Sequence, residues 1–456
     1  CHELTVHDNY RSSMRWRASD LARALSEHGP CRVSGPDVEI DGASFDSRDL
    51  RPGQMFVALI AERDGHDFVP GAVEAGAVAC LVSREPSPDV ATRTTSIVVP
   101  DTSVALMDAA RWARSLFPAG TMAVGITGSV GKTSTKDFVA AAVSPSRRTV
   151  ANPRSYNNEQ GLPVTILNAP RDTEVLVLEM GMRGFGQIDS LCRVARPAIG
   201  VVTRVGEAHT SKVGGIDGVA QAKGELVEAL PSFGAAVLNA DDPRVVAMRS
   251  RTNARVVTFG ESAEADVRIT GLDLGPLGDA RFTAFTPNGA IDVRLSIPGR
   301  HMASNAAAAL ATGLVLGIPL DAMAEGLASA SLSPHRMKIL RVPTGATIVD
   351  DSYNANPTSV QAALETLAGL RASRRIAVLG LMAELDDEVA AHRRISDLAA
   401  RLDVEVIAVG TDSYGVPATT IDDAVTQILD LDETAAVLVK GSRVAGLDRL
   451  VERVTQ

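Results

Sequence analysis

A glycine-rich loop between an apolar strand and a helix constrains this chain more than any other feature. The loop spans Gly125–Thr133 with the sequence GITGSVGKT, between a strand-like run at 121–127 and a helical pattern at 132–143. Glycine lets backbone N–H groups curl around phosphate oxygens, which a Cβ atom would obstruct. The Lys132 ammonium can then reach the terminal phosphates, and the Thr133 hydroxyl can bind Mg²⁺. An ordinary glycine-rich turn is the alternative, but the Gly-Lys-Thr ending between strand and helix predicts a nucleoside triphosphate site.

The loop does not identify the reaction, because kinases, switches and ligases all bind nucleotides in this way. Its spacing also departs from the generic phosphate-loop pattern, in which the first glycine would fall at Ile126. We expect the nucleotide contacts of the loop to come from seven consecutive residues: Gly128, Ser129, Val130, Gly131, Lys132, Thr133 and Ser134.

Composition limits the classes of protein to which the chain can belong. Of its 456 residues, 45% are apolar and 22% are charged, as in a folded globular protein of about three domains. The net charge of −10 argues against a nucleic-acid partner, because such proteins need clustered positive charge. No apolar run reaches 18 residues, so we expect no insertion into a membrane.

The cysteines favour a reducing compartment. No C-x-x-C pair occurs among the four, so neither a zinc site nor a disulfide framework is indicated. We therefore expect a cytoplasmic protein. We also expect a monomer. The chain begins with Cys1 rather than methionine, so we expect a trimmed or mis-started sequence. The first dozen or so residues are predicted to form a poorly ordered extension.

The order of strands and helices predicts an α/β protein of three domains. Short apolar strands and turns predict a small N-terminal domain at 16–119, with strands at 53–59 and 77–83 and a helix at 103–117. Two larger domains are expected at 120–332 and 333–456. The first of these two is predicted as a central phosphate-loop ATPase domain, and the second as an open, Rossmann-like domain.

Strands alternate with helical patterns through both larger domains, which predicts parallel sheets covered on both faces. In an open sheet of this kind, ligands bind beyond the carboxyl ends of the strands. The stretch 265–298 has the alternation of an antiparallel appendage, and 302–317 is predicted as a helix. The further predicted strands lie at 174–180, 198–205, 235–240, 255–260, 345–353, 374–380, 404–410 and 435–441.

The unusual phosphate loop TGSVGKT resembles that of the Mur ligase family, and other segments match the family in order from about Leu21 to Val451. These segments are FDSRDLRPGQMFVAL (45–59), DGHDF (64–68), SYNNEQGLPVTIL (155–167), EMGMRGFGQI (179–188), VGEAH (205–209), AQAKGEL (220–226), GRHMASNAAAAL (299–310), SPHRMKI (333–339), DDSYNANP (350–357) and VLVKGSR (437–443). The segments DDSYNANP and KGSR, with Asn157-Asn158, resemble the member of the family that adds D-alanyl-D-alanine.

Three residues are candidates for the metal and catalytic chemistry beside Lys132 and Thr133. Glu179 ends a predicted strand, so its carboxylate can bind Mg²⁺, although a solvated strand-end acid is the alternative. His209 also follows a strand and suits a second Mg²⁺, although a lone histidine is more often structural. For Lys223, within a helical stretch, a surface salt bridge is the default. The resemblance implies instead a carbamylated lysine that orients the metal.

The resemblance also implies contacts to the nucleotide and the substrates. Asn305 would contact adenine, Arg336 the γ-phosphate and Asp351 the ribose of ATP. In KGSR, charge-assisted donors would bind the dipeptide carboxylate, and each has the alternative of an ordinary loop residue. The candidate substrate-binding residues are Ser47, Arg48, Asn157, Asn158, Asn354, Asn356, Lys440, Ser442 and Arg443.

Together these segments imply an ATP- and Mg²⁺-dependent ligase that joins D-alanyl-D-alanine to UDP-N-acetylmuramoyl-tripeptide through an acyl phosphate. The N-terminal domain would hold the UDP-sugar, and the C-terminal domain would close on the nucleotide and bind the dipeptide. A related Mur-type ligase with another amine or acyl substrate is one alternative. An ATP-driven switch or binding protein is another. A folate polyglutamylating enzyme fits DDSYNANP poorly.

Two positions depart from the family pattern. Met302 follows the histidine of GRH, where the family usually has asparagine, and Leu381 replaces a usual acidic residue. The first bears on a nucleotide or interdomain contact. The second lies near the expected dipeptide site and bears on the identity of the second substrate.

Overall fold

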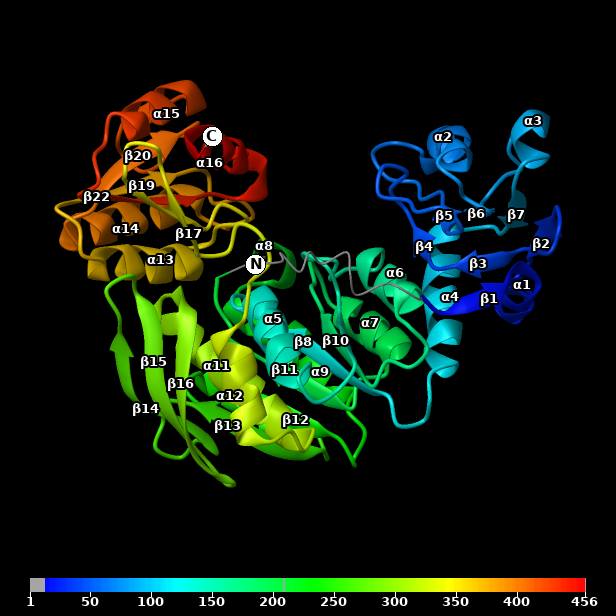
Figure 1. The fold of residues 1–456 in the computed structure, drawn as a ribbon, viewed down its shortest axis with the longest axis horizontal. Helices are drawn as coiled ribbons and strands as arrows, with labels where there is room; N and C mark the ends of the chain where they lie inside the picture. The colour runs from blue at the N-terminus through cyan, green and yellow to red at the C-terminus, as the bar shows by residue number, and fades with distance from the viewer. Residues whose placement is uncertain (1–12, 208–209, 456) are drawn as a thin grey trace. The chain divides into compact units, whose positions relative to one another are not determined.

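The computed structural model describes residues 13–207 and 210–455 (Figure 1). The predicted N-terminal extension and His209 therefore lie outside the described residues. The chain divides into two compact units, the first made of Cys1–Gly125, Arg147–Gly181 and Gly186–Ala198 and the second of the remaining segments. No helix within the described ranges is both long and apolar enough to cross a membrane. The three predicted domain boundaries remain predictions.

The N-terminal part of the first unit contains a five-stranded sheet. Its strands are β2 (Arg32–Ser34), β4 (Ala43–Ser44), β5 (Met55–Val57), β6 (Ala79–Val82) and β7 (Thr95–Val98), and the helices of this part are α1 (Ala18–Ser26), α2 (Val69–Glu74), α3 (Pro88–Ala91) and α4 (Thr102–Ser115). The order is β2-β7-β6-β5-β4, with β2 antiparallel at one edge and the other four parallel. Phe56, Val73 and Cys80 belong to its apolar core. A separate antiparallel pair joins β1 (Arg15–Arg17) to β3 (Glu39–Asp41).

The rest of the first unit carries β10 (Val175–Glu179), β9 (Thr149–Ala151) and the first four residues of β8 (Met122–Thr127), in the order β8-β10-β9. β10 and β9 are parallel. Helices α6 (Gly161–Asn168) and α7 (Gln187–Ala195) follow β9 and β10 in the chain. Glu179 is the last residue of β10, as predicted, so its side chain stands at a carboxyl strand end.

The second unit contains the helix of the phosphate loop, α5 (Lys132–Val143), whose predicted bounds are confirmed. Its first group of strands comprises β11 (Ile199–Val202), β12 (Ala235–Asn239), β13 (Arg255–Gly260), β14 (Val267–Leu274), β15 (Asp279–Thr286) and β16 (Gly289–Pro298), and its helices here are α8 (Thr210–Val213), α9 (Ile216–Glu228), α10 (Pro243–Ala247), α11 (Arg300–Val315) and α12 (Leu320–Ala328). Strands β11 to β14 are parallel, whereas β14, β15 and β16 are antiparallel, which confirms the predicted appendage (Figure 1).

A six-stranded sheet forms the C-terminal part of the second unit, in the order β17-β18-β22-β19-β20-β21. The strands are β17 (Lys338–Arg341), β18 (Thr347–Asp350), β19 (Arg374–Leu379), β20 (Glu405–Val409), β21 (Ala418–Thr419) and β22 (Ala435–Lys440), and the helices are α13 (Pro357–Gly369), α14 (Glu388–Arg401), α15 (Ile421–Leu429) and α16 (Asp448–Thr455). The four predicted strands are confirmed and are parallel. Two short edge strands, β17 and β21, were not predicted, because neither has a long apolar run.

The sequence explains both the buried strands of this sheet and the start of the helix that follows β18. β18, β19 and β22 are rich in buried valine, isoleucine and leucine, as expected for parallel strands covered on both faces. After β18, Asn356 caps α13 by accepting a hydrogen bond from Ser359 N–H at 2.9 Å, and Pro357 occupies the first helical turn. The loops after β18 and β22 carry most of the predicted C-terminal site residues.

Candidate functional site

Two glycines shape the phosphate loop. Gly128 and Gly131 have φ values of 153° and 81°, which side-chain-bearing residues rarely adopt. A Cβ at Gly128 would lie 1.9 Å from Thr203 Oγ1, and one at Gly131 would lie 2.6 Å from Asn305 Oδ1. The loop is therefore a close-fitting backbone turn that only glycine allows. This is the shape expected of a phosphate cradle at a helix N-terminus.

Residues that follow β11 form hydrogen bonds to the phosphate loop and support its backbone. Thr203 Oγ1 donates to Val130 O at 2.6 Å, and Ser129 N–H donates to Arg204 O at 2.7 Å. Ser129 Oγ also exchanges two hydrogen bonds with the backbone of Gly206, at 2.9 and 3.0 Å. Thr203 and Arg204 were missing from the predicted site, because no local motif marks them. Their position at the carboxyl end of a parallel strand was the only available signal.

The structure brings three predicted nucleotide residues together at the start of α5. Lys132 Nζ donates to Gly128 O at 2.7 Å, so its ammonium is folded back over the loop. Arg336 Nη2 donates to Thr133 Oγ1 at 3.2 Å, although the two residues are 203 positions apart. Val130 is half-buried, and Ser134 is buried behind the loop. A lysine, an arginine and a threonine hydroxyl thus converge where terminal phosphates are expected.

Asn305 adjoins the same loop from α11. Its side chain is buried at 8% exposure, and its Nδ2 donates to Met302 Sδ at 3.7 Å. Met302, the first departure from the family pattern, is therefore a sulfur acceptor for the predicted adenine-binding residue. A sulfur acceptor is weak, so the Asn305 amide keeps most of its capacity to bind a ligand.

Lys223 is a buried lysine rather than a surface one. The side chain is only 2% exposed on α9. Burial lowers its pKa well below the ordinary value for lysine, and the positive charge of Lys132 lowers it further. A surface salt bridge, the default alternative for this lysine, is therefore excluded by burial. The lowered pKa increases the share of neutral amine relative to an exposed lysine, and the neutral amine is the form that can act as a nucleophile.

Glu179 is also buried, at 1% exposure. Its Oε1 accepts a hydrogen bond from Asn157 Nδ2 at 2.7 Å, and its backbone N–H donates to Asn152 Oδ1 at 2.8 Å. Its Oε2 has no hydrogen-bond partner among the described residues. A solvated strand-end acid, the alternative interpretation, is therefore wrong. A buried carboxylate oxygen without a donor is a suitable position for a cation.

The neighbouring Asn158 has a local role in the structure. Its side-chain oxygen accepts hydrogen bonds from Gly161 N–H at 2.9 Å and Gln160 N–H at 3.3 Å, which stabilises the turn into α6. Asn157 supports Glu179 instead. The two adjacent asparagines, predicted together as substrate-binding residues, thus have separate protein partners in the first unit.

Asp351 and Lys440, which the sequence assigned to the ribose and to the dipeptide, contact each other in the structure. Asp351 and Lys440 form a buried ion pair in the C-terminal part, and Lys440 Nζ also donates to Asn354 O at 2.9 Å. Lys440 is 1% exposed, and burial lowers its pKa although Asp351 opposes this effect. The Lys440 ammonium is therefore occupied by protein groups, whereas Asn354 presents its side chain on the surface.

The Ser442 hydroxyl, like the Lys440 ammonium, is hydrogen-bonded to protein groups, whereas the Arg443 side chain is exposed. Ser442 Oγ accepts from Ala383 N–H at 2.9 Å and donates to Ala355 O at 3.2 Å, so it ties three loops together. Arg443 is exposed, with its guanidinium carbon 5.6 Å from the ring centre of Tyr353. Of the three predicted carboxylate donors in KGSR, Arg443 has the most accessible charge. Leu381, the second departure from the family pattern, accepts at its carbonyl from Ser442 N–H.

The N-terminal candidates lie on one loop of the first unit. Arg48 is exposed and pairs with Asp46 through two hydrogen bonds of 2.6 and 2.8 Å, while Ser47 is half-buried. The Asp46 carboxylate raises the pKa of Arg48 above its ordinary value. The Arg48 guanidinium is therefore held in position on the surface, where a substrate phosphate would have to compete with Asp46.

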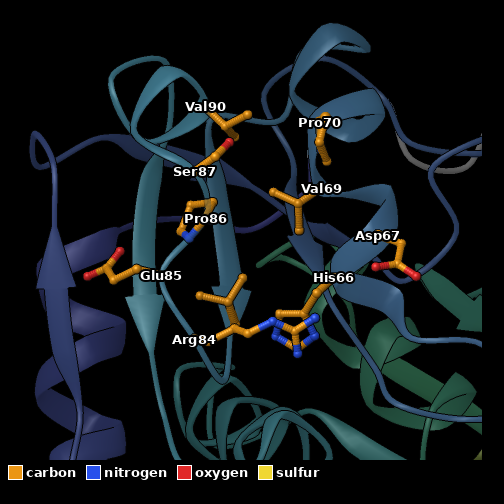
Figure 2. A pocket seen from close by; sticks show the side chains of 10 residues that line it. His66, Asp67, Val69, Pro70, Arg84, Glu85, Pro86, Ser87 and Val90 are labelled. Carbon is orange, nitrogen blue, oxygen red and sulfur yellow. The ribbon is translucent and has the colours of Figure 1, made fainter.

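A pocket of about 300 Å³ opens elsewhere in this part (Figure 2). Figure 2 shows Arg84 and His66 at one end, and Val90 and Pro70 at the other. His66 is not a free base, because Ser83 N–H donates to its Nε2 at 2.9 Å and its Nδ1 bonds to Asp64 at 2.7 Å. The His66 motif DGHDF thus has a structural role beside this pocket.

A second cavity, of about 550 Å³, lies in the second unit beside Gly206. Glu207 and Arg394 form an ion pair of 2.9 Å among its lining residues. Two further arginines and one aspartate line it: Arg204, Arg401 and Asp397. The excess of positive charge suits an anionic ligand next to the phosphate loop.

The predicted metal site is only partly within the described residues. No cluster of three or more histidine, cysteine, aspartate or glutamate side chains that could hold a metal occurs in the described ranges. Of the predicted ligands, Thr133 and Glu179 are described and buried, and His209 is not described. The Mg²⁺ site remains a prediction.

Comparison with known proteins identifies the family. The family model for the Mur ligase middle domain matches residues 126–313, and the model for the Mur ligase glutamate ligase domain matches residues 335–454. A UDP-N-acetylmuramoyl-tripeptide–D-alanyl-D-alanine ligase of Mycobacterium tuberculosis is 42% identical over 80% of this chain and 77% of its own length. The enzyme of that name from Escherichia coli is 34% identical over 93% of this chain and 96% of its own length.

Solved structures agree with the sequence comparison. A crystal structure of MurF from Acinetobacter baumannii has a TM-score of 0.85 at 29% identity, covering 97% of this chain and 99% of that one. A MurF ligase from Thermotoga maritima, solved in complex with ADP, has a TM-score of 0.78 at 28% identity, covering 91% and 97%. The α/β fold, the ligase class and the resemblance to the D-alanyl-D-alanine-adding member are thereby confirmed. The chain belongs to the Mur ligase family.

Proposed function

We propose that this chain joins D-alanyl-D-alanine to UDP-N-acetylmuramoyl-tripeptide at the expense of ATP, in the synthesis of peptidoglycan precursors. The observation that carries the proposal is the convergence of Lys132, Thr133 and Arg336 in a phosphate loop, in a chain whose relatives are named for this reaction. The proposed location is the cytoplasm, where ATP is available, and the proposed form is a monomer.

In the first step, the terminal carboxylate of the tripeptide attacks the γ-phosphate of ATP, which gives an acyl phosphate and ADP. Catalysis of such a step depends mainly on position and charge neutralisation. The backbone of Gly128 to Thr133 would cradle the phosphates, and Lys132 and Arg336 would neutralise the transferring group. Asn305 would contact adenine, and Asp351 the ribose.

Mg²⁺ would supply charge neutralisation at the phosphates of ATP, and two described residues each have a chemistry that suits it. Glu179 offers a buried carboxylate oxygen that no described residue occupies, and Asn157 fixes the other oxygen of that carboxylate. Thr133 offers a buried hydroxyl at the loop. Oxygen ligands of these two types are those that Mg²⁺ prefers, and substrate phosphates usually complete its shell. His209 is the third proposed ligand.

Lys223 is proposed to be carbamylated. Because burial and Lys132 depress its pKa, the neutral amine would form an N–C bond to carbon dioxide and release one proton to solvent, which leaves an anionic carbamate. An anion at this position would offset the Lys132 charge and orient the metal. The burial of Lys223 is otherwise unfavourable, because an isolated buried ammonium is not stable.

In the second step, the free amine of D-alanyl-D-alanine attacks the acyl carbonyl, an amide bond forms, and inorganic phosphate leaves. Residues 333–456 would bind the dipeptide, with the exposed Arg443 as the donor to its carboxylate. Lys440 and Ser442 would hold the surrounding loops. Residues 16–119 would hold the UDP-sugar with Ser47 and Arg48, and residues 120–332 would carry the chemistry.

The proposal is tested by product mass spectrometry in a reaction containing UDP-muramoyl-tripeptide, ATP, Mg²⁺ and four competing amines. D-alanyl-D-alanine should be preferred over D-alanine, meso-diaminopimelate and L-glutamate by at least about tenfold in kcat/KM, or roughly 1.4 kcal/mol. A site built for a dipeptide leaves polar groups unpaired when a single amino acid binds. A dominant product with another amine would leave the ligase chemistry intact and refute the assigned substrate. Phosphate release that needs no amine would instead indicate an ATP-driven switch.

A further inference from the structure

The segment that carries Arg336 into the phosphate loop has an unusual backbone. His335 and Met337, on either side of Arg336, have φ values of 60° and 49°. Residues other than glycine adopt this left-handed conformation rarely and at a free-energy cost, so the surroundings must enforce it. Both strained residues are direct neighbours of Arg336, so their backbone conformation determines where the Arg336 side chain leaves the chain.

Both ends of the segment are fixed. Ser333 N–H donates to Asp137 Oδ2 at 2.7 Å, and Asp137 lies on α5, the helix of the phosphate loop. Asp137 in turn pairs with the buried Lys136 at 3.0 Å. Met337, at the other end, is 2% exposed and leads directly into β17.

His335 supplies a third fixed point in the middle. Its Nδ1 donates to Asp350 Oδ2 at 2.8 Å, and the Asp350 side chain is 3% exposed at the end of β18. The other carboxylate oxygen of Asp350 accepts from Ser352 N–H at 3.1 Å and from Ser352 Oγ at 2.6 Å. The carboxylate therefore cannot rotate without losing these bonds, and it is a rigid anchor for the imidazole.

The Arg336 side chain is directed by the same arrangement. Its guanidinium carbon lies 4.3 Å from the ring centre of Tyr353, and its Nη2 donates to Thr133 Oγ1. Tyr353 N–H donates to His335 O at 3.4 Å, so the aromatic platform is bonded to the residue before the arginine. The position of Arg336 is thus set by its neighbour His335 as well as by its own contacts.

We propose that His335 is a positioning residue, whose hydrogen bond to Asp350 holds the strained segment so that Arg336 points at the terminal phosphate of ATP. The inference rests on the proposed function, because it takes Arg336 to contact the γ-phosphate. It predicts that the side chain of His335 matters for ATP, which has a γ-phosphate, and not for ADP, which lacks one.

Three substitutions separate the anchor from the backbone. His335→Gly removes the hydrogen bond to Asp350 but adopts the left-handed conformation without strain. His335→Asn keeps a side-chain donor for Asp350 and also tolerates this conformation. His335→Ala loses the hydrogen bond and is strained in the left-handed conformation. Asp403, an exposed residue with φ 55° at the end of α14, gives the matched control Asp403→Gly. The measurements are Kd for ADP and for a non-hydrolysable ATP analogue with Mg²⁺, and the KM values for ATP and for the dipeptide.

We expect His335→Gly and His335→Ala to bind the ATP analogue about tenfold more weakly, the effect of about one charge-assisted hydrogen bond. ADP binding and the KM for the dipeptide should stay within about twofold, and His335→Asn and Asp403→Gly should resemble the parent. A general folding defect would lower the active fraction, and hence kcat, without a selective change in the analogue Kd. If His335→Ala does not fold, the glycine variant still decides.

His335→Gly with unchanged analogue affinity would overturn the inference, as would equal losses for ADP and the analogue. These outcomes are distinct from failure of the proposed function, in which the parent enzyme binds the analogue but forms no dipeptide adduct. The binding measurements need neither amine nor acyl substrate, so each conclusion can fail separately.

Discussion

The phosphate loop and the loops after β18 and β22 were both predicted as ligand-binding regions, but they are built differently. In the phosphate loop, Lys132, the glycines and Thr133 are neighbours in the chain, and the Lys132 ammonium bonds back to Gly128 O. In the other region, Lys440 lies 89 residues from Asp351, and the two bind each other. The polar groups of the first region bond within the loop and to its immediate supports, whereas Asp351 and Lys440 of the second are joined in a buried ion pair.

The difference shows which functional residues a sequence pattern can identify. A phosphate loop is a local structure, so the spacing of glycine, lysine and threonine fixes its geometry. The role of Lys440 depends on which strands become neighbours, and β22 lies beside β18 only in the folded sheet. A motif therefore locates the second region correctly without showing which of its members remain free for a ligand.

The largest expected effect lies in the phosphate loop. Lys132→Ala should reduce ligation by about 10³–10⁵-fold, the range that one positive charge on a transferring phosphoryl group contributes. Phosphate release and a thermal melt would be measured together, because Lys132 is only half-buried and the fold should persist. Activity within tenfold of the parent at an unchanged melting temperature would remove the basis for treating this loop as the nucleotide site.

Most of the fold was predictable because its strands are apolar runs that alternate with helices. The predicted bounds of α5 agree with the structure, and 265–298 is antiparallel as expected. The short edge strands β17 and β21 were missed, since their few residues carry no periodic signal. In the site, Thr203 and Tyr353 were missed because their importance comes from distant partners, Val130 and Arg336.

The second prediction concerns stability in the β18 and β22 region. Lys440→Ala should lower the free energy of unfolding by about 3–5 kcal/mol, because it leaves the Asp351 carboxylate buried without its partner. Arg443→Ala is the control, since an exposed arginine should change stability by less than about 0.5 kcal/mol. Urea unfolding measures both.

Kinetics on the same two variants would sharpen the distinction. If Arg443 binds the dipeptide carboxylate, Arg443→Ala should raise the KM for D-alanyl-D-alanine while Lys440→Ala acts mainly through stability. The reverse pattern, a stable Lys440→Ala with a raised KM for the dipeptide, would show that Lys440 is a ligand donor after all. The two regions would then be alike.

A third effect, of about a hundredfold on kcat, is expected for Lys223→Ala. Partners that orient metal ligands typically contribute 10- to about 100-fold. Added short carboxylic acids should restore part of the activity, because a free carboxylate can occupy the vacated space and offset the Lys132 charge. Full activity without rescue would show that the buried lysine has no carbamate and serves only the packing of α9.

The smallest expected effect is a pH dependence of stability at His335. The hydrogen bond to Asp350 raises the pKa of His335 above 6.5, whereas burial opposes the shift, and Asp448 and Glu452 on α16 add to the raising effect. A histidine with a raised pKa in the folded state stabilises it fully below its ordinary pKa, and this contribution is lost as pH rises through the folded value. Asp350 has a lowered pKa despite its burial, since His335 and Ser352 donate to it, so it stays ionised at mildly acidic pH.

The free energy of unfolding of the parent should therefore exceed that of His335→Asn by more at about pH 5.5 than at about pH 9. The difference should remain below about 1 kcal/mol, because the imidazole is 29% exposed and solvent screens the pair. Repeating the comparison in an Asp350→Asn background should remove most of the pH dependence, and an undiminished pH dependence there would assign the effect to α16 rather than to the anchor.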